Sequence, residues 1–316
     1  MGLLVHFTIK KLNKFYERNK EKNIMETNLR QSNAKVFIEG LVSEKDLTVK
    51  TEDGKTKITG SLTVKTSDVN FVKFSINANE KTNAGTDNKC YAGLLTVMNE
   101  YKTIAEVGEE EADKVKVTGD LNLYTSAQTG ANIVGFKSNF FNRVKANEEF
   151  EQKAEFSVEV FISAIIPEMN TEGEETGRVL VKGWVPTYNG IEPITLVAAD
   201  DIGAAVECTF EPGQTVEFMG DIVNNRIETV TEIPMAIGKP KKKVKVDFKN
   251  ELVITGASTA YEEGETPEKP YDAEVIKAAI QERTNKLEEA KAKAQSGQKT
   301  NNTKPSGAAK GRTLGF

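Results

Sequence analysis

An internal repeat constrains the fold of this chain more than any other feature of its sequence. Residues 36–38 (VFI) and 160–162 (VFI) each open a strand-like run, and residues 115–121 (VKVTGDL) are echoed later by residues 216–222 (VEFMGDI). Between these matches each half carries two glycines six positions apart: Gly54 with Gly60, and Gly177 with Gly183. Three matches in the same order predict a tandem duplication of one small β-rich domain, an arrangement that commonly lengthens a binding surface.

The length and composition agree with two domains in a soluble protein. A chain of 316 residues accommodates two domains of about 100 residues with flanking segments. Its 38% hydrophobic content includes no apolar run near the roughly 20 residues that cross a bilayer. The apolar start precedes its lysines, unlike a secretory signal, and Cys90 and Cys208 lie at unrelated places in the two repeats. We therefore expect a reducing, cytoplasmic setting, which is the host cytoplasm if a phage encodes the protein.

Charge is strongly segregated along the chain, although the net charge is only -5. Residues 239–249 hold six lysines against Asp247, residues 262–274 hold six acids against Lys269, and the segment from Ser296 carries bases alone. Such blocks usually form solvated faces or tails, but they also decide which partners a surface attracts.

These patterns divide the chain into six segments. The leader is expected to be helical or disordered, and Met25 offers an alternative start of the reading frame. The second repeat is shorter, and its missing length falls where the first repeat holds a helix and a loop. The predicted segments are a leader (1–33), a first β domain (34–145), a second β domain (156–256), an acidic linker (257–272), a helix (273–295) and a disordered basic tail (296–316).

The residues of most enzyme sites are absent. His6 is the only histidine and lies in the leader, so neither repeat can hold a histidine-based relay or a histidine-containing zinc site. There is no phosphate-binding loop and no dinucleotide fingerprint. The repeated Asp120 and Asp221 follow a strand glycine and suit a turn or bulge better than catalysis. We predict a binding protein that is not an enzyme and needs no cofactor or metal.

Four segments of the first repeat carry a family resemblance. Residues 34–40 (AKVFIEG), 71–78 (FVKFSINA), 114–121 (KVKVTGDL) and 125–131 (TSAQTGA) are similar to the opening strand, the core strand, the strand after the helix and the exposed hairpin of the bacterial and phage single-stranded DNA-binding protein family. The resemblance spans residues 34–145 and more faintly 156–233. It implies a mainly β protein of two tandem OB-fold-like Greek-key barrels, followed here by a helix and a flexible tail.

The resemblance also implies how the chain would act. Aromatic faces stack bases, lysines and arginines follow phosphates, and the partner is single-stranded DNA during replication or recombination. The predicted stacking residues are Tyr124, Phe136, Phe140, Trp184 and Tyr188; an indole at position 184 equally suits a core or interface. The predicted phosphate contacts are Lys55, Lys57, Lys137, Arg143, Arg178, Lys182, Lys241, Lys242, Lys243 and Lys245. Phe37, Phe74, Phe161 and Phe218 are assigned to the barrel cores.

This chain departs from the family at its end, and other functions remain open. The family's tail is acidic with a terminal proline and phenylalanine, whereas this tail is basic and ends in Thr313-Leu314-Gly315-Phe316. Replication or recombination proteins would then meet the acidic stretch or the C-terminal segment, and two barrels in one chain imply fewer subunits. The alternatives are a phage structural protein of the virion and an OB-fold adaptor that binds polypeptides in replication.

Overall fold

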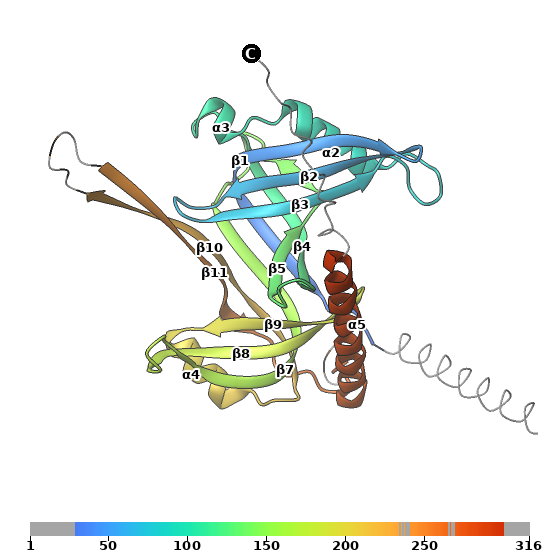
Figure 1. Ribbon diagram of the computed structural model, residues 1–316, viewed down its shortest axis with the longest axis vertical. Helices are drawn as coiled ribbons and strands as arrows, with labels where there is room; N and C mark the ends of the chain where they lie inside the picture. The colour runs from blue at the N-terminus through green and yellow to red at the C-terminus, as the bar shows by residue number, and fades with distance from the viewer. Residues whose placement is uncertain are drawn as a thin grey trace, which may run out of the picture.

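Eleven strands form one continuous sheet that closes on itself twice, giving two barrels (Figure 1). The computed structural model describes residues 29–299 except 234, 236, 238–240, 265, 267 and 268. The expectations for residues 1–28 and 300–316 lie outside this part of the chain.

The first barrel runs from Ala34 to Arg143, and its strands follow the closed order β1-β2-β3-β5-β4-β1. Helix α2 begins at Asn88, whose side chain accepts a hydrogen bond from the Cys90 amide at 3.0 Å, as a good N-cap does. The elements are β1 (Ala34–Glu52), β2 (Lys55–Lys65), β3 (Phe71–Asn79), α2 (Lys89–Glu100), α3 (Ile104–Val107), β4 (Lys114–Thr125), β5 (Asn132–Lys137) and β6 (Phe141–Arg143).

The second barrel repeats this topology, with the closed order β7-β8-β9-β11-β10-β7. Its elements are β7 (Lys153–Met169), β8 (Glu175–Thr187), β9 (Gly190–Ala198), α4 (Asp200–Thr209), β10 (Thr215–Ile233) and β11 (Lys241–Ala257), and the long helix α5 (Ala273–Lys299) follows. The predicted mainly β fold with a C-terminal helix is confirmed, and the two closed strand orders agree with the expected pair of OB-like barrels. The second barrel keeps its helix as α4, so the length it lacks comes from the loop before α2 and the α3 segment after it.

The two barrels are joined by a backbone pairing that has an approximate two-fold axis. Strand β1 pairs antiparallel with β7, and Val36 lies opposite Phe156. Val36 also pairs with Gly119 in the first barrel, just as Phe156 pairs with Gly220 in the second. Val36 and Phe156 therefore occupy the same position in their barrels, so each barrel presents the same strand edge to the other. Two copies of one domain in a symmetric dimer meet in this way.

The true register of the duplication differs from the one read in the sequence. Because Val36 corresponds to Phe156, residues 160–162 match residues 40–42, four positions away from residues 36–38. Gly183 lies opposite Ile162 and so corresponds to Val64, not to Gly60. The two barrels share one strand order, as a duplication would give, but only the Gly-Asp match joins equivalent positions. Strand alternation alone produces matches out of register, because its period is only two residues.

The repeated glycine has a steric reason. A Cβ atom on Gly119 would lie 2.5 Å from the carbonyl oxygen of Lys137, and one on Gly220 would lie 1.9 Å from that of Val253. At both positions the strand crosses its neighbour too closely for any side chain. The Gly-Asp match therefore lies where packing tolerates only glycine.

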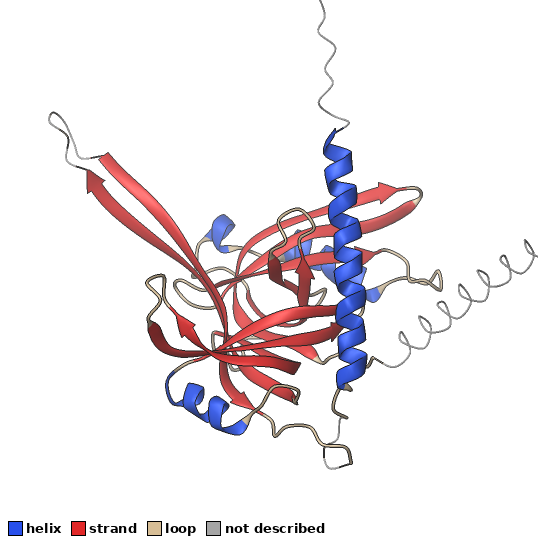
Figure 2. Cartoon of the chain, turned by 60° about the horizontal axis from the view of Figure 1, so that its bottom comes forward, coloured by secondary structure: helices blue, strands red, loops and turns tan. Residues whose placement is uncertain are grey.

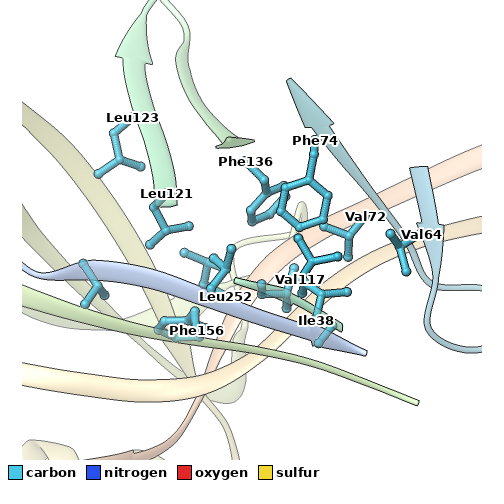
Figure 3. Packing of buried hydrophobic residues seen from close by; sticks show 14 of the residues in the cluster. Ile38, Val64, Val72, Phe74, Val117, Leu121, Leu123, Phe136, Phe156 and Leu252 are labelled. Carbon is cyan, nitrogen blue, oxygen red and sulfur yellow. The ribbon is translucent and has the colours of Figure 1, made fainter. Parts of the chain in front are cut away.

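Inward-pointing side chains fill both barrels. Phe74 packs edge to face on Phe136, with ring centroids 6.2 Å apart, in the cluster shown in Figure 3, and Phe210 packs on Phe218 in the second barrel. Phe74 and Phe218 are core residues, as predicted. The core assignment of Phe37 is wrong: it lies on the outer side of β1 and is 42% exposed. Phe161 is buried, but in a smaller cluster beneath α5.

Candidate nucleic-acid interface

The first barrel carries a polar surface on β2, β3 and β5, which we call the outer face. Strict alternation creates it: Val72, Phe74 and Ile76 point into the barrel, so the residues between them point out. Lys73 pairs with Thr63 across the strands, and Ser75 pairs with both Ser61 and Lys137. The outer face consists of Lys57, Thr59, Ser61, Thr63, Lys73, Ser75, Asn77, Asn79 and Lys137.

Two cations of the outer face, Lys73 and Lys137, are available to a ligand. Lys73 and Lys137 are exposed, and neither has an acidic partner among the described residues. A hollow of about 370 Å³ lies at one end of the face, where Ser61, Thr63 and Lys73 meet the acidic side chains of Glu44, Asp46 and Glu106. Away from this acidic end, the hydroxyl, amide and ammonium groups of the face suit phosphate and sugar oxygens.

The loop between β5 and β6 holds an aromatic ring beside the outer face. Asn139 binds the backbone of Asn77 in both directions: its Oδ1 accepts from the amide at 3.3 Å, and its Nδ2 donates to the carbonyl at 3.2 Å. Ser138 Oγ accepts from the Phe140 amide at 3.0 Å. These bonds fix the loop against β3 and leave the Phe140 ring 59% exposed.

The other two rings of this hairpin that the sequence predicts to stack bases, those of Tyr124 and Phe136, differ in exposure. Tyr124 lies on the outer side of β4, opposite Ile133, and is 46% exposed. The prediction of a stacking role for Phe136 is wrong, because its ring is buried against Phe74. Phe136 lies one position before Lys137, and neighbouring residues of a strand point to opposite faces.

Three residues of the first barrel that the sequence predicts to contact phosphates differ in how free their charge is. Lys55 is exposed at the turn between β1 and β2. Lys57 donates to Glu52 at 2.9 Å, an exposed pair that costs little to break. Arg143 is bound to Asp113 at 2.9 Å and stacks on the Tyr101 ring at 4.4 Å, so its charge is already compensated.

In the second barrel α5 (Figure 2) packs over Trp184 of β8 and Ile191 of β9, while Lys182 of β8 stays exposed. Trp184 is half-buried and packs in a cluster with Phe161, Ile191 and Ile276. Arg283 of α5 lies 5.6 Å above the Trp184 ring and binds Glu192 at 3.1 Å. Of the two roles left open for this indole, the structure therefore favours the interface.

The remaining predicted residues of this barrel lie around α5 and at the far edge. Arg178 is held by Glu251 at 2.7 Å and Glu168 at 3.4 Å. Lys182 is exposed on β8, and Tyr188 is 87% exposed at the turn before β9. An open cleft of about 690 Å³ separates this turn from α5 and the β4–β5 hairpin.

A buried carboxylate anchors the start of α5. Glu159 is 2% exposed and accepts hydrogen bonds from Arg30 at 2.7 Å, from the Tyr271 hydroxyl at 3.0 Å and from the Tyr261 hydroxyl at 3.2 Å. Burial, reinforced by the negative charge of Glu159, raises the pKa of both tyrosines. This cluster ties the segments before β1 and before α5 to β7.

The hairpin of β10 and β11 extends well beyond the second barrel (Figure 1). Residues 226–233 and 241–248, which we call the arm, pair with each other, and at the base of the arm the Arg226 amide donates to the Val69 carbonyl at 2.8 Å. Residues opposite one another share a face, so Lys241, Lys243 and Lys245 line one side together with Thr229 and Thr231, while Lys242 lies on the other side. Lys245 is paired with Asp247 at 2.9 Å.

The sequence analysis missed two kinds of residue. Lys73 belongs to the outer face, and the alternation of residues 71–78 could have identified it. Phe248 is 68% exposed on the arm and alternates with the lysines of β11. The predicted residues form no single groove: the structure places Lys137, Phe140 and Tyr124 on one barrel, the lysines on the arm, and Trp184 beneath α5.

Within the described ranges, no three His, Cys, Asp or Glu side chains are arranged to hold a metal ion. None of the helices described there is long and apolar enough to span a bilayer.

Comparison with known proteins identifies a family and two distant structures. A family model described as YorF matches residues 32–293. No curated protein matches the sequence. The wild-type single-stranded DNA binding protein from Thermus aquaticus shares 10% identity at a TM-score of 0.42, over 77% of this chain and 98% of that one. A deletion mutant of it gives 10% identity and 0.40, over 76% and 100%. These scores are too low to support an argument about function.

Proposed function

The chain belongs to the YorF family, and we propose that this protein binds and protects single-stranded DNA during replication or recombination. The observation that carries the proposal is the outer face of the first barrel. It combines two unpaired lysines, a row of hydroxyl and amide groups, and an exposed ring that two hydrogen-bonded side chains hold at its edge. The strand 2 and strand 3 face of an OB barrel is where such barrels bind oligonucleotides.

The mechanism is electrostatic contact combined with stacking. Lys73 and Lys137 neutralise phosphates, and each contact contributes about 0.7 to the slope of log affinity against log salt. Phe140 stacks a base, which contributes about 1 to 3 kcal/mol. Tyr124 offers a second ring farther along the β4–β5 hairpin. The side chains between them are small and uncharged, so the face reads the backbone of the strand and not its sequence.

The arm extends this surface past the first barrel. The base of β10 contacts the loop before β3, where the amide of Asn224 donates to Asn70 Oδ1 at 2.8 Å. A strand leaving the outer face on this side meets Lys241, Lys243 and Lys245 next. Under this proposal Trp184 of the second barrel stacks no base, because α5 covers it.

A salt titration of paired charge variants tests the proposal. The affinity for a fluorescent oligothymidine is measured between about 50 and 200 mM salt for the wild type and for the double variant Lys73→Glu/Lys137→Glu. We expect weaker binding and a shallower salt slope for the variant. The control is Lys145→Glu/Lys277→Glu, which changes the net charge equally but alters the loop after β6 and the exposed side of α5.

Two outcomes would contradict the proposal. One is a wild-type protein that does not bind the oligonucleotide at any of these salt concentrations. The other is a control variant that loses as much affinity as the variant of the outer face, because binding would then depend on total charge alone.

A further inference from the structure

The two sides of the arm differ in charge. Residues opposite one another in β10 and β11 share a side. One side, which we call the lysine side, has three lysines and one acid: Ile227, Thr229, Thr231, Ile233, Lys241, Lys243, Lys245 and Asp247. The other side has two cations and two acids: Arg226, Glu228, Val230, Glu232, Lys242, Val244, Val246 and Phe248. The arm therefore carries a net positive charge on one side only.

The lysines of the lysine side are open to phosphate ligands. Lys241, Lys243 and Lys245 are all exposed. Among the described residues, Lys241 and Lys243 have no acidic partner, and Lys245 has only the exposed Asp247 at 2.9 Å, a pair that costs little to break. Because they alternate along β11, successive lysines lie about 7 Å apart. Such a row of ammonium groups suits a row of phosphates.

The lysine side lacks a ring on which an unpaired base could stack. Binding of single strands combines cations with aromatic faces, as on the outer face. The only aromatic residue of the arm, Phe248, falls on the other side, where it is 68% exposed. In a duplex the bases already stack on one another, so contacts with the phosphate backbone can hold it without such a ring. The chemistry of the lysine side therefore suits paired DNA better than unpaired DNA.

The shape of the arm also suits a duplex. A two-stranded β-ribbon can enter the major groove of DNA, which is about 12 Å wide. The eight pairs between residues 226–233 and 241–248 extend about 26 Å, which is most of one helical turn of about 34 Å. The arm projects away from the second barrel (Figure 1), so a partner thicker than a single strand has access to it.

The base of the arm is held next to the outer face. Asn70 lies directly before β3, and its Oδ1 accepts from the Asn224 amide at 2.8 Å. Its Nδ2 donates to the Ile222 carbonyl at 2.8 Å. Lys73 of the outer face follows Asn70 by three residues, which is about 10 Å along the strand. DNA that leaves the outer face past the start of β3 therefore meets the base of the arm.

We propose that the arm binds double-stranded DNA next to the single strand on the outer face, so that the protein recognises junctions between paired and unpaired DNA. This inference goes beyond the proposed function and rests on it, because the outer face holds the unpaired strand. Without a duplex, the lysine side still attracts the phosphates of a single strand. A duplex binds more tightly because it offers two rows of phosphates to the same lysines.

Fluorescence anisotropy with three kinds of DNA tests the inference. The first is an oligothymidine of about 16 nucleotides, the upper site size of an OB barrel. The second is a blunt hairpin duplex of about 20 base pairs, or two helical turns. The third is the same hairpin with the oligothymidine as a tail, at the 3′ end in one version and at the 5′ end in another.

The wild type should prefer a tailed hairpin. We expect at least one version to bind about tenfold more tightly than the oligothymidine near 50 mM salt, because contacts with duplex phosphates are strong at low salt. The blunt hairpin should bind more weakly than the tailed one, since it leaves the outer face empty.

Paired variants separate the two sides of the arm. Lys241→Gln/Lys243→Gln should lose most of the preference for the tailed hairpin, and the salt slope for this DNA should fall by about 0.9 for each lysine. Its affinity for the oligothymidine should change much less, because the outer face is intact. The matched control Arg226→Gln/Lys242→Gln removes as many charges from the other side and should keep the preference.

Three results would overturn the inference: equal binding of the tailed hairpins and the oligothymidine, equal binding of the tailed and blunt hairpins, or equal losses from the two arm variants. Failure of the proposed function gives a different result, because the wild type would then not bind the oligothymidine. A wild type that binds the oligothymidine without preferring a tailed hairpin contradicts this inference alone.

Discussion

At the scale of single residues, the direction of a side chain decides between stability and binding. Phe136 and Phe140 are four positions apart on one hairpin, yet one ring is 5% exposed and the other 59%. Phe136 falls on the inward side of a regular strand, whereas Phe140 lies in a loop that Asn139 fixes against β3. Their substitution should therefore have opposite consequences.

Replacing Phe140 with alanine should weaken the binding of single-stranded DNA and leave the fold intact. The loss of one stacked base corresponds to about five- to 150-fold in affinity. Phe37→Ala is the matched control, because that ring is also exposed but lies where β1 pairs with β4 and β7. Equal losses from both variants in an anisotropy titration would show that Phe140 has no special role.

Replacing Phe136 with alanine should instead destabilise the first barrel. Removing a buried phenylalanine costs about 3 to 5 kcal/mol, since the cavity beside Phe74 cannot close fully. Urea denaturation measures the change. A variant as stable as the wild type but defective in DNA binding would contradict this expectation and support a stacking role for Phe136.

The sequence predicts such directions only where alternation is regular. The core roles of Phe74 and Phe218 follow from it, and so would the outward direction of Lys73. Trp184 shows the limit of this reasoning. Its side chain points out of the barrel, as expected for a stacking platform, but α5 returns from more than ninety positions away to cover it. No local pattern encodes that contact.

At the scale of elements, α5 acts as a strut between the barrels. Arg283 binds Glu192 of β9 and Thr125 of β4, and the hydroxyl of Thr125 donates to the same Glu192 carboxylate at 3.0 Å. One side chain of the helix thereby fixes the β4–β5 hairpin of the first barrel to the second.

A double-mutant cycle should detect the strut. Arg283→Ala and Glu192→Ala should show a coupling energy within about 0.5 to 3 kcal/mol in the free energy of unfolding, because the two side chains are only 15% and 22% exposed. The i,i+4 pair of Lys286 and the partly buried Glu282 on the same helix serves as the control, with an expected coupling of about 0.3 to 0.5 kcal/mol. A coupling no larger than that of the control would remove the argument for a strut.

The anchor of α5 should make the protein sensitive to alkali. Burial raises the pKa of Tyr271 and Tyr261 above the ordinary value of 10.0, so these tyrosines stay protonated in the folded state while those of the unfolded chain ionise. The unfolded state then binds fewer protons, and stability falls as pH rises past that value. Urea denaturation across this range should show a decline that is smaller for Tyr271→Phe. Stability that rises above pH 10 would contradict the burial of these hydroxyls.

The sequence predicts the strands and helices better than it predicts which residues of the two repeats are equivalent. The strand order of both barrels agrees with the fold expected from the repeat, and the C-terminal helix follows from its apolar spacing. The register of the duplication was misread because any two strands of similar alternation match every second position. Only Gly119 and Gly220, where no side chain fits, mark equivalent places.

At the scale of the molecule, the chain is a fused symmetric pair whose symmetry is broken twice. The pairing of β1 with β7 gives both barrels equivalent surroundings, and Thr125 contacts Glu192 much as Asn224 contacts Asn70 on the opposite side. Helix α5 then covers one side of the pair, and the arm extends from the other. The result is one outer face and one lysine ribbon in place of two equal binding surfaces.

This asymmetry leads to a central claim that one measurement tests directly: single-stranded DNA lies on the first barrel and the arm, and not beneath α5. Oligothymidine carrying a photoreactive thymidine is cross-linked to the full chain, and the modified peptides are identified by mass spectrometry. The account predicts cross-links within residues 71–79, 132–140 and 241–248. Cross-links concentrated around Trp184 and Ile191, with none on the outer face, would contradict it.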